Sequence, residues 1–384
     1  MLRQPPTMKG DSMKILCDRE KLAAAFQTAA LFAPSRSPKP ILQNVKLEVT
    51  KTGAIFMATD MEVGVRIAVE GVDVTKEGSA ILPLANFGAI LRESSDEKLQ
   101  IEVTSKGTVI KGERSEFKLT SEDPAEFPAV AAFEEKKYHV IPAPLFKQII
   151  LRTEFATDME SSRYALGGVL VELDEKKIIA VGTDGRRLAK MEGPAESVGG
   201  HKTGDTMTII RTQSMRAIGR ALSDNDGQVH LAARGNDVLI RTERAVYYSR
   251  LVEGRFPRWR DVFPSRRDAA KIDVTVGTFH SALRQAAVVT NQESRGIDFN
   301  FAEGTLTLAA STAETGQSKV DMPISYSGPP ISVTLDHRYV ADFLKVLNPE
   351  QTVTIDIENA EAAAVFFADD QAYGYVVMPL SRDR

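Results

Sequence analysis

Apolar residues recur along this chain with two different spacings, and each spacing predicts one kind of secondary structure. Alternation at every second position, as in the run NVKLEV from Asn44, is typical of strands with one buried face. Apolar side chains three and four positions apart, as at Leu22, Phe26 and Ala29, are typical of helices packed against a sheet. The two spacings predict six helices separated by strands, at residues 19–33, 83–93, 142–157, 211–222, 277–292 and 335–347.

The same order of elements recurs three times, and the copies lie roughly a third of the chain apart. One marker is an apolar strand that ends in two small polar residues, at Thr59-Asp60, Thr183-Asp184 and Ser311-Thr312. A second marker is the strand before it, which reads NVKLEV, GGVLVEL and GIDFNF in the three copies. Because repeats at a fixed spacing indicate tandem structural units, we expect an α+β protein of three similar domains. Each domain should have antiparallel sheets on the outside and two helices packed against them.

Two proline-containing stretches separate the repeats. DPAEFPAV covers residues 123–130, and EGRFPRWRDVFP covers residues 253–264. Proline cannot donate to a central sheet ladder, so we expect both stretches to be extended interdomain linkers. The predicted domains are residues 13–137, 138–264 and 265–384, preceded by a disordered N-terminal arm at residues 1–12.

The composition offers little chemistry for an enzyme, which is the first alternative class. No apolar run approaches the ~20 residues needed to cross a membrane, and the N-terminus has no secretion signal, so we expect a cytoplasmic protein without a membrane partner. The single cysteine, Cys17, excludes an internal disulfide, and the five histidines lack metal-ligand spacing. Asp60 and Asp184 are expected to serve in turns. We therefore predict no catalytic residue, no metal site and no cofactor.

Charge is distributed unevenly along the chain. The formal net charge is −4, yet the predicted helices together are net positive, so the remaining residues are more acidic. This separation is typical of a protein that holds a polyanion such as DNA against its helices. Sparse cations favour weak, salt-sensitive and sequence-independent binding, although each one could equally be an ordinary solvated residue. The helix cations are Lys147, Arg152, Arg211, Arg216, Arg220, Arg284 and Arg338.

A second alternative is a sequence-specific DNA-binding regulator with repeated domains. Such a protein would need a recognition element whose side chains read base edges, for example a helix-turn-helix. We find no such element in the sequence.

Four runs, together with the three repeats, resemble one family. They are RYALGGVLVEL, TDGRRLA, GRFPRW and the terminal YVVMPL. In combination they are similar to the bacterial sliding clamps, the beta subunits of DNA polymerase III. The resemblance implies a head-to-tail homodimer that closes into a six-domain ring around duplex DNA, without sequence preference and without a catalytic site. It also implies that the ring confers processivity by tethering the polymerase III alpha subunit, the clamp loader, other polymerases and repair proteins through their short clamp-binding peptides.

The resemblance also implies three sets of site residues. Taken alone, the TDGRR turn favours an ordinary surface β-turn, but in the family it forms one wall of a peptide-binding pocket. The pocket set is Leu166, Thr183, Gly185, Arg186, Arg187, Leu188, Pro257, Val262, Val376, Met378, Pro379 and Leu380. The helix cations named above are joined in the DNA-binding set by Arg36, Arg163 and Tyr164. The dimer-interface set is Phe117, Glu116, Val288, Val289 and Lys319.

Some positions depart from the family pattern. Arg186 stands where the family often has histidine, and Asp261 occupies an edge of the pocket that can be basic. Glu116 replaces an expected basic residue, while Lys319 lies in a region that is usually acidic. We therefore expect an altered peptide preference, and a reversed charge pair between Glu116 and Lys319 across the subunit contact.

Overall fold

The structure is a computed structural model that describes residues 13–104, 107–120, 122–160, 165–203, 207–263, 269–291, 293, 295–369 and 371–380. The predicted arm at residues 1–12 and two predicted DNA-binding residues, Arg163 and Tyr164, lie outside these ranges. The chain divides into two compact units. Unit 1 is Met1–Pro144, Ser197–Lys202 and Ala217–Leu251; unit 2 is Leu145–Glu196, Thr203–Arg216 and Val252–Arg384.

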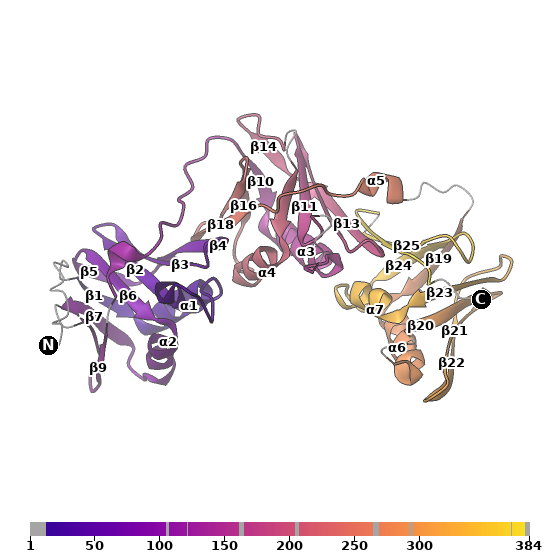
Figure 1. The fold of residues 1–384 in the computed structure, drawn as a ribbon, viewed down its shortest axis with the longest axis horizontal. Helices are drawn as coiled ribbons and strands as arrows, with labels where there is room; N and C mark the ends of the chain where they lie inside the picture. Colours follow the sequence, from indigo (N-terminus) through magenta and orange to yellow (C-terminus); the bar gives the residue numbers. More distant parts are fainter. Residues whose placement is uncertain are drawn as a thin grey trace. The chain divides into compact units, whose positions relative to one another are not determined.

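Unit 1 holds two antiparallel sheets (Figure 1). The smaller has the order β5 (Val72–Lys76), β1 (Lys14–Asp18), β7 (Lys98–Thr104), β8 (Gly107–Lys111) and β9 (Glu116–Leu119). The larger has the order β14 (Glu196–Val198), β10 (Tyr138–Pro142), β16 (Gln228–Ala233), β17 (Asp237–Arg241), β18 (Ala245–Arg250), β4 (Val63–Val69), β3 (Gly53–Thr59), β2 (Asn44–Thr50) and β6 (Gly78–Pro83). Helices α1 (Arg19–Ala30) and α2 (Leu84–Glu93) pack against each other, and α1 also packs on β3 and β4.

The apolar stripe of α1 is buried as its spacing predicts. Asp18 caps the helix by accepting a hydrogen bond from the Lys21 amide at 3.0 Å. About two turns further on, Phe26 makes edge-to-face contacts with Phe56 and Phe87, at ring-centroid distances of 5.6 and 5.0 Å. These aromatic contacts join α1 to the sheet and to α2, so the predicted helix face is the core of this part of unit 1.

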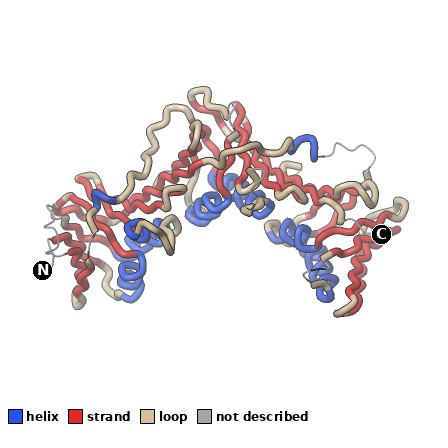
Figure 2. The backbone as a smooth tube through the Cα atoms, viewed as in Figure 1, coloured by secondary structure: helices blue, strands red, loops and turns tan. Residues whose placement is uncertain are grey.

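Unit 2 also holds two antiparallel sheets. The larger has the order β15 (Thr208–Arg211), β11 (Gly168–Asp174), β12 (Lys177–Thr183), β13 (Arg187–Pro194), β26 (Tyr373–Val377), β25 (Ala364–Ala368), β24 (Thr352–Ile357) and β19 (Ala270–Thr275). The smaller has the order β22 (Gly316–Pro323), β21 (Thr305–Thr312), β20 (Gly296–Ala302) and β23 (Ile331–Asp336). Helices α6 (Val276–Ala286) and α7 (His337–Lys345) pack side by side (Figure 2). The second repeat contributes α3 (Ala143–Thr153) and α4 (Thr212–Ala221).

The α+β class with antiparallel sheets and paired helices is confirmed, and the repeats are joined by continuous sheets. Strand β18 of the second repeat pairs with β4 of the first, with Tyr247 opposite Val65. In the same way, β13 of the second repeat pairs with β26 of the third, with Leu188 opposite Val376. Each of the two large sheets therefore contains strands from two repeats. Because strands pair across each repeat boundary, neither boundary is a simple flexible linker.

The structure corrects the expected element ends and the linkers. Residues 335 and 336 complete β23, and α7 begins only at His337 because Asp336 caps it, accepting from the Arg338 amide at 3.0 Å. The expectation that residues 253–264 are wholly extended is wrong, since Trp259–Val262 forms the short helix α5. Trp259 is buried there, and burial of its large ring favours the local turn over an extended path.

Candidate functional site: the Thr183 turn and its surroundings

The turn between β12 and β13 is a closed hydrogen-bonded structure. The Thr183 hydroxyl donates to the Arg187 carbonyl at 2.6 Å and accepts from the Gly185 amide at 3.1 Å. One carboxylate oxygen of Asp184 accepts from the amides of Arg186 and Arg187, at 2.9 and 3.0 Å. Gly185 has a φ of +87°, a conformation that costs glycine nothing. The turn residues therefore satisfy one another, and Asp184 is confirmed as a turn residue.

The first repeat builds the same turn between β3 and β4. The Thr59 hydroxyl donates to the Val63 carbonyl at 2.7 Å, and Asp60 accepts from two successive amides at 2.8 Å. Met61 stands in the place of Gly185 and adopts a φ of +80° despite its side chain. The predicted turn role of Asp60 is thus confirmed, and the repeat extends to the hydrogen bonds of the turn.

Beside the second turn lies an apolar cluster that joins the second repeat to the C-terminal strand. Leu188 on β13 and Val376 on β26 are its centre, and the aromatic rings of Phe256 and Trp259 come from the linker. Phe263 packs against the same cluster directly over Gly374, where a side chain would leave only 2.3 Å between the new carbon and the ring. The linker is thus held on the sheet by these aromatic side chains and by hydrogen bonds from Trp259 Nε1 at 3.3 Å and from Arg260 at 3.0 and 2.6 Å to Glu172 on β11.

Three apolar side chains of the linker and the C-terminal run face solvent. Val262, Met378 and Leu380 keep 44%, 45% and 37% of their surface exposed. The backbone holds the last two in place, because the Met378 amide donates to the Arg186 carbonyl and the Leu380 amide donates to the Thr334 carbonyl, both at 2.9 Å. We call these three side chains, together with the buried cluster, the TDG surface.

The structure brings most of the predicted pocket residues into this one region. Leu188 and Val376 form its buried floor, and Thr183 and Gly185 form the adjoining turn. Sequence reasoning missed Phe256, Trp259 and Phe367, which pack in or against the same cluster. The one available signal was Trp259, the only tryptophan of the chain, placed in a linker where a large ring has no reason to be unless it packs.

Arg187 has a different position from the one expected of a pocket wall. Its guanidinium donates to Asp184 at 3.0 Å, to Asp342 at 2.8 Å and to the Phe155 carbonyl at 2.8 Å, and it stacks on the Tyr339 ring at 4.5 Å. Burial disfavours the charged guanidinium, but the phenol of Tyr375 and the carboxylates of Asp342 and Asp184 outweigh this effect and raise the pKa of Arg187. Leu188 contacts the apolar cluster instead, so the Arg187 side chain supports the turn from the helix side of the sheet.

The predicted DNA-binding residues fall into two groups. Most are accessible, and Arg216 is half-buried, with an ion pair to Glu154. The structure corrects the prediction that Arg152 is accessible to DNA. Arg152 is only 7% exposed, pairs with Asp369 and lies over the Tyr373 ring at 5.1 Å, so its side chain belongs to the core of unit 2. The exposed members are Arg36, Arg211, Arg220, Arg284 and Arg338, and Lys147 is of intermediate exposure.

The predicted interface residues lie on the open edges of the two small sheets or beside them. Phe117 and Glu116 are on β9, the outer strand of its sheet, and Lys319 is on β22, the outer strand of the other. Glu116 pairs within the chain with Lys111 and Lys118, at 3.2 and 3.1 Å, and these lysines lower the pKa of its carboxyl. Lys319 pairs with Asp321 at 3.4 Å.

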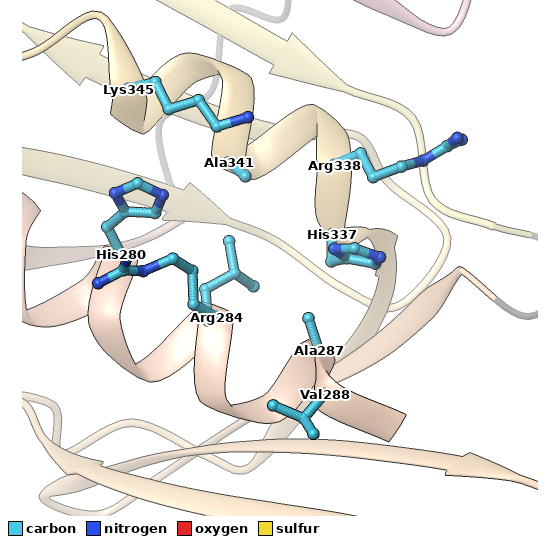
Figure 3. Close-up of a pocket in the computed structure, with 9 residues that line it drawn as sticks. His280, Arg284, Ala287, Val288, His337, Arg338, Ala341 and Lys345 are labelled. Carbon is cyan, nitrogen blue, oxygen red and sulfur yellow. The ribbon is translucent and has the colours of Figure 1, made fainter. Parts of the chain in front are cut away.

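Just beyond α6, Val288 is 79% exposed (Figure 3), while Val289 is partly covered.

A buried histidine pair lies in unit 1. The two Nδ1 atoms of His139 and His201 are 2.7 Å apart. Nε2 of His201 lies 3.1 Å from the Ala233 amide nitrogen and 3.3 Å from the Ala233 carbonyl oxygen. Burial lowers the pKa of His201; the hydrogen bond with the Ala233 backbone opposes this shift, and His139 adds to it.

Three other features bear on the kind of protein. Cys17 is buried, and burial together with Asp18 raises the pKa of its thiol to about 12, which makes it unreactive. No cluster of three metal-ligating side chains is found in the part of the chain that the structure describes. None of the helices among those residues has the length and apolarity to span a membrane.

Comparison with known proteins gives one consistent family. Family models of the DNA polymerase III beta subunit match residues 13–131 (N-terminal domain), 140–258 (central domain) and 260–381 (C-terminal domain). The beta sliding clamp of Chlamydia pneumoniae is 28% identical over 96% of this chain and 99% of its own, and that of Escherichia coli K12 is 25% identical over 96% and 100%. The crystal structure of the DNA polymerase III subunit beta from Pseudomonas aeruginosa is 25% identical, with a TM-score of 0.88 over 96% of this chain and 100% of that one.

The match is to the whole of these relatives, and it accounts for all three repeats. The sequence-specific regulator finds no support among them. Members of the matched family are processivity factors, accessory subunits of a DNA polymerase without a catalytic site of their own. The chain therefore belongs to the DNA polymerase III beta subunit family and is a DNA sliding clamp of three clamp domains.

Proposed function

We propose that two copies of this chain join head to tail into a closed ring around duplex DNA, and that the TDG surface tethers partner proteins to it. The partners are the DNA polymerase III alpha subunit, the clamp loader, other polymerases and repair proteins, each through a short linear peptide. The domains of the ring are those expected from the repeats, at residues 13–137, 138–264 and 265–384. The observation that carries the proposal is the succession of three clamp-domain matches along one chain.

Ring closure is supported by the two unlike strand edges. Strand β9 closes one small sheet and β22 closes another, and each presents unpaired backbone groups on its outer side among the described residues. Unlike surfaces that meet head to tail give a closed ring when the rotation between copies suits. Phe117 on β9 and the exposed Val288 beside β22 would supply the apolar centre of such a contact.

Tethering is supported by the chemistry of the TDG surface. It combines an exposed methionine, which adapts to different apolar side chains, with a rigid floor built on paired strands. A short peptide could place an apolar side chain against Met378 and Leu380 and bond to the turn backbone. Arg186 lies in the Thr183 turn, and its side chain is exposed. An exposed cation at the edge of the TDG surface favours peptides with an acidic residue.

DNA retention is supported by the scattering of the cations. Among the described residues of the DNA-binding set, the exposed arginines lie on three helices (Arg220, Arg284 and Arg338), at the end of β15 (Arg211) and in a loop (Arg36), and this scattering suits a protein that slides instead of gripping. In this proposal the ring holds DNA by topology, and the cations only keep the duplex centred.

The test of encirclement uses nicked circular DNA loaded by the clamp loader. The protein should stay on the circle through gel filtration in high salt and should be lost when the circle is linearised. Val288→Asp should give a monomer by light scattering and abolish retention, whereas Leu31→Asp, at a residue 41% exposed elsewhere, should leave the dimer intact. Equal retention on linear and circular DNA would refute encirclement.

The test of tethering uses a labelled polymerase C-terminal peptide and fluorescence anisotropy. Met378→Asp should weaken binding by roughly tenfold or more, because it places a charge on an apolar contact. Leu151→Asp is the matched control, an exposed apolar residue on α3. Unchanged binding by the Met378 variant would exclude the TDG surface as the peptide site.

A further inference from the structure

The boundary between the first and second repeats, in unit 1, corresponds strand by strand to the boundary that carries the TDG surface in unit 2. In unit 2, Leu188 on β13 lies opposite Val376 on β26. In unit 1, Gly64 on β4 takes the corresponding place, opposite Tyr248 on β18. The two residues follow the threonine of their turns by the same number of positions. The residue that forms the floor of the TDG surface is therefore a glycine at the first boundary.

An apolar cluster lies beside the first boundary too. It contains Met57 on β3 and Ile81 on β6, which lie on either side of one position of β2. In the cluster of the TDG surface, Val181 and Ile209 lie in the same way on either side of one position of β11. The two boundaries thus share the arrangement of their apolar side chains as well as that of their strands.

The linker of the first boundary lies on this cluster with two buried side chains. Phe127 and Val130 belong to the cluster and are 5% and 6% exposed. A side-chain carbon added at Gly64 would lie only 3.1 Å from Val130 Cγ1. The Val130 side chain therefore occupies the space over the glycine, where the corresponding residue of the second repeat has its own leucine side chain.

Side chains of the sheet also bond to the backbone of this linker. Arg66 Nη1 donates to the Val130 carbonyl at 3.3 Å, and Lys46 Nζ donates to the Pro124 carbonyl at 3.1 Å. Apolar side chains held in pockets, together with hydrogen bonds to the main chain, are the contacts by which proteins bind extended peptides. The linker thus makes the contacts of a bound peptide within its own chain.

The rim of the first boundary resembles the TDG surface in one respect and differs in another. Met61 is 44% exposed and Met378 is 45% exposed, so each boundary presents an accessible methionine. The Arg250 amide donates to the Glu62 carbonyl at 2.8 Å, as the Met378 amide does to the Arg186 carbonyl. The side chains of Arg250 and Glu62 form an ion pair at 3.4 Å. A ligand of this rim therefore needs polar groups beside its apolar side chains.

We propose that Met57, Met61, Gly64 and Ile81 form a second peptide-binding surface, which the linker at residues 123–130 occupies from within the same chain. An extended peptide of another protein, with two apolar side chains spaced like those of the linker, binds there only when the linker withdraws. A short tether gives the linker an effective concentration in the millimolar range, which excludes a peptide at micromolar concentration. The use of this surface by other proteins rests on the proposed function of the TDG surface, whereas its occupation by the linker rests on the contacts of unit 1.

The first experiment follows methionine methyl groups by NMR in the intact protein, because Met57 and Met61 report on the first boundary and Met378 reports on the TDG surface. In the wild-type protein, the polymerase C-terminal peptide should shift the Met378 signal and leave the other two unchanged. In a Phe127→Ser, Val130→Ser double variant, it should shift all three signals, and calorimetry should find two bound peptides per chain instead of one. Addition of Met378→Asp should remove the binding at the TDG surface and leave that at the first boundary.

A steric variant displaces the linker without removing its side chains. Gly64→Leu places a leucine where Val130 lies, as Leu188 stands in the second repeat, and it should also give a second bound peptide. In both kinds of variant, amide hydrogen exchange at residues 123–130 should become faster, which reports release of the linker. Val72→Ser, at a half-buried valine on β5 in the other sheet of unit 1, is the matched control and should bind one peptide.

The second experiment does not depend on the TDG surface. A synthetic peptide with the sequence of residues 123–133 should shift the Met57 signal of the Phe127→Ser, Val130→Ser variant saturably. The wild-type protein should not respond at Met57, because its own linker is in place. If the wild-type protein fails to bind the polymerase peptide while the synthetic peptide binds the double variant, the TDG surface is wrong and the first boundary stands.

Two results would overturn the proposal. One is a polymerase peptide that binds at Met378 but never reaches Met57 in a variant whose linker has been released. The other is hydrogen exchange at residues 123–130 that stays unchanged both in the Phe127→Ser, Val130→Ser variant and in Gly64→Leu, since the apolar contacts would then not hold the linker.

Discussion

Replacement of Arg187 by methionine should destabilise unit 2 strongly, although the family resemblance assigns this residue to a binding pocket. The side chain is about 10% exposed and bridges Asp184 to Asp342, at 3.0 and 2.8 Å. Methionine fills similar volume but leaves the largely buried carboxylate of Asp184, 16% exposed, without its cation. Removal of one partner from a buried ion pair costs about 3–5 kcal/mol. Because Asp342 is 33% exposed and can be resolvated, we expect the lower end, about 3 kcal/mol.

The single tryptophan makes this measurable. Trp259 lies in the apolar cluster of unit 2, so its fluorescence follows the unfolding of that unit. For a unit of this size, a loss of about 3 kcal/mol lowers the midpoint of thermal unfolding by roughly 6–12 °C. Arg186→Met is the matched control, because Arg186 neighbours Arg187 in the chain but its side chain is exposed. This variant should shift the midpoint of thermal unfolding by roughly 2 °C or less.

The two variants should also separate stability from binding. Arg186→Met should weaken the binding of an acidic peptide without loss of stability, whereas Arg187→Met should lose both together. If Arg187→Met unfolds at the same temperature as Arg186→Met, the supporting role of Arg187 is wrong, and its side chain must be available to ligands.

Three further outcomes follow from features described above. Burial lowers the pKa of His201 below its ordinary 6.5. As the pH falls through 6.5, the unfolded chain therefore binds a proton at His201 that the folded chain does not bind. The stability of unit 1 in urea should therefore be full above pH 6.5 and fall below it, and a His139→Asn, His201→Asn double variant should flatten that dependence. Glu116→Lys and Lys319→Glu should each weaken the dimer seen by analytical ultracentrifugation and restore it when combined; no restoration would exclude their pairing. Met61→Gly should raise the stability of unit 1 by up to ~1 kcal/mol, since it relieves a positive φ, and a loss of stability would show that the methionine side chain packs usefully.

Much of the fold could be predicted from periodicity and repetition. The buried stripe of α1 and the turn roles of Asp60 and Asp184 follow from local sequence, because caps and turns depend on residues close together in the chain. The pairing of β18 with β4, and of β13 with β26, could not be predicted from the residues alone. Edge strands of neighbouring repeats carry no local signal for their partner, since alternation marks only the buried face.

The candidate site shows the same division. The resemblance located the TDG turn and the C-terminal run, and the structure places both beside one apolar cluster. It could not tell on which face of the sheet each side chain lies, so Arg187 and Arg152 were assigned to ligands although both guanidinium groups are enclosed by their own chain. A charge count along a helix cannot separate buried from exposed cations, because an arginine paired with a carboxylate and an arginine in water have the same letter in the sequence.

The sheet that runs from β14 to β6 has a consequence for how such a protein can change over evolutionary time. Its strands come from two sequence repeats, and the other large sheet, from β15 to β19, also draws on two. If the chain were cut at a repeat junction, or if one repeat were replaced by that of a distant homologue, a strand edge would lose its partner. Its unpaired backbone groups would then promote aggregation. Exchange of a single repeat is therefore disfavoured: the three copies can diverge in sequence, but they must be inherited as one piece.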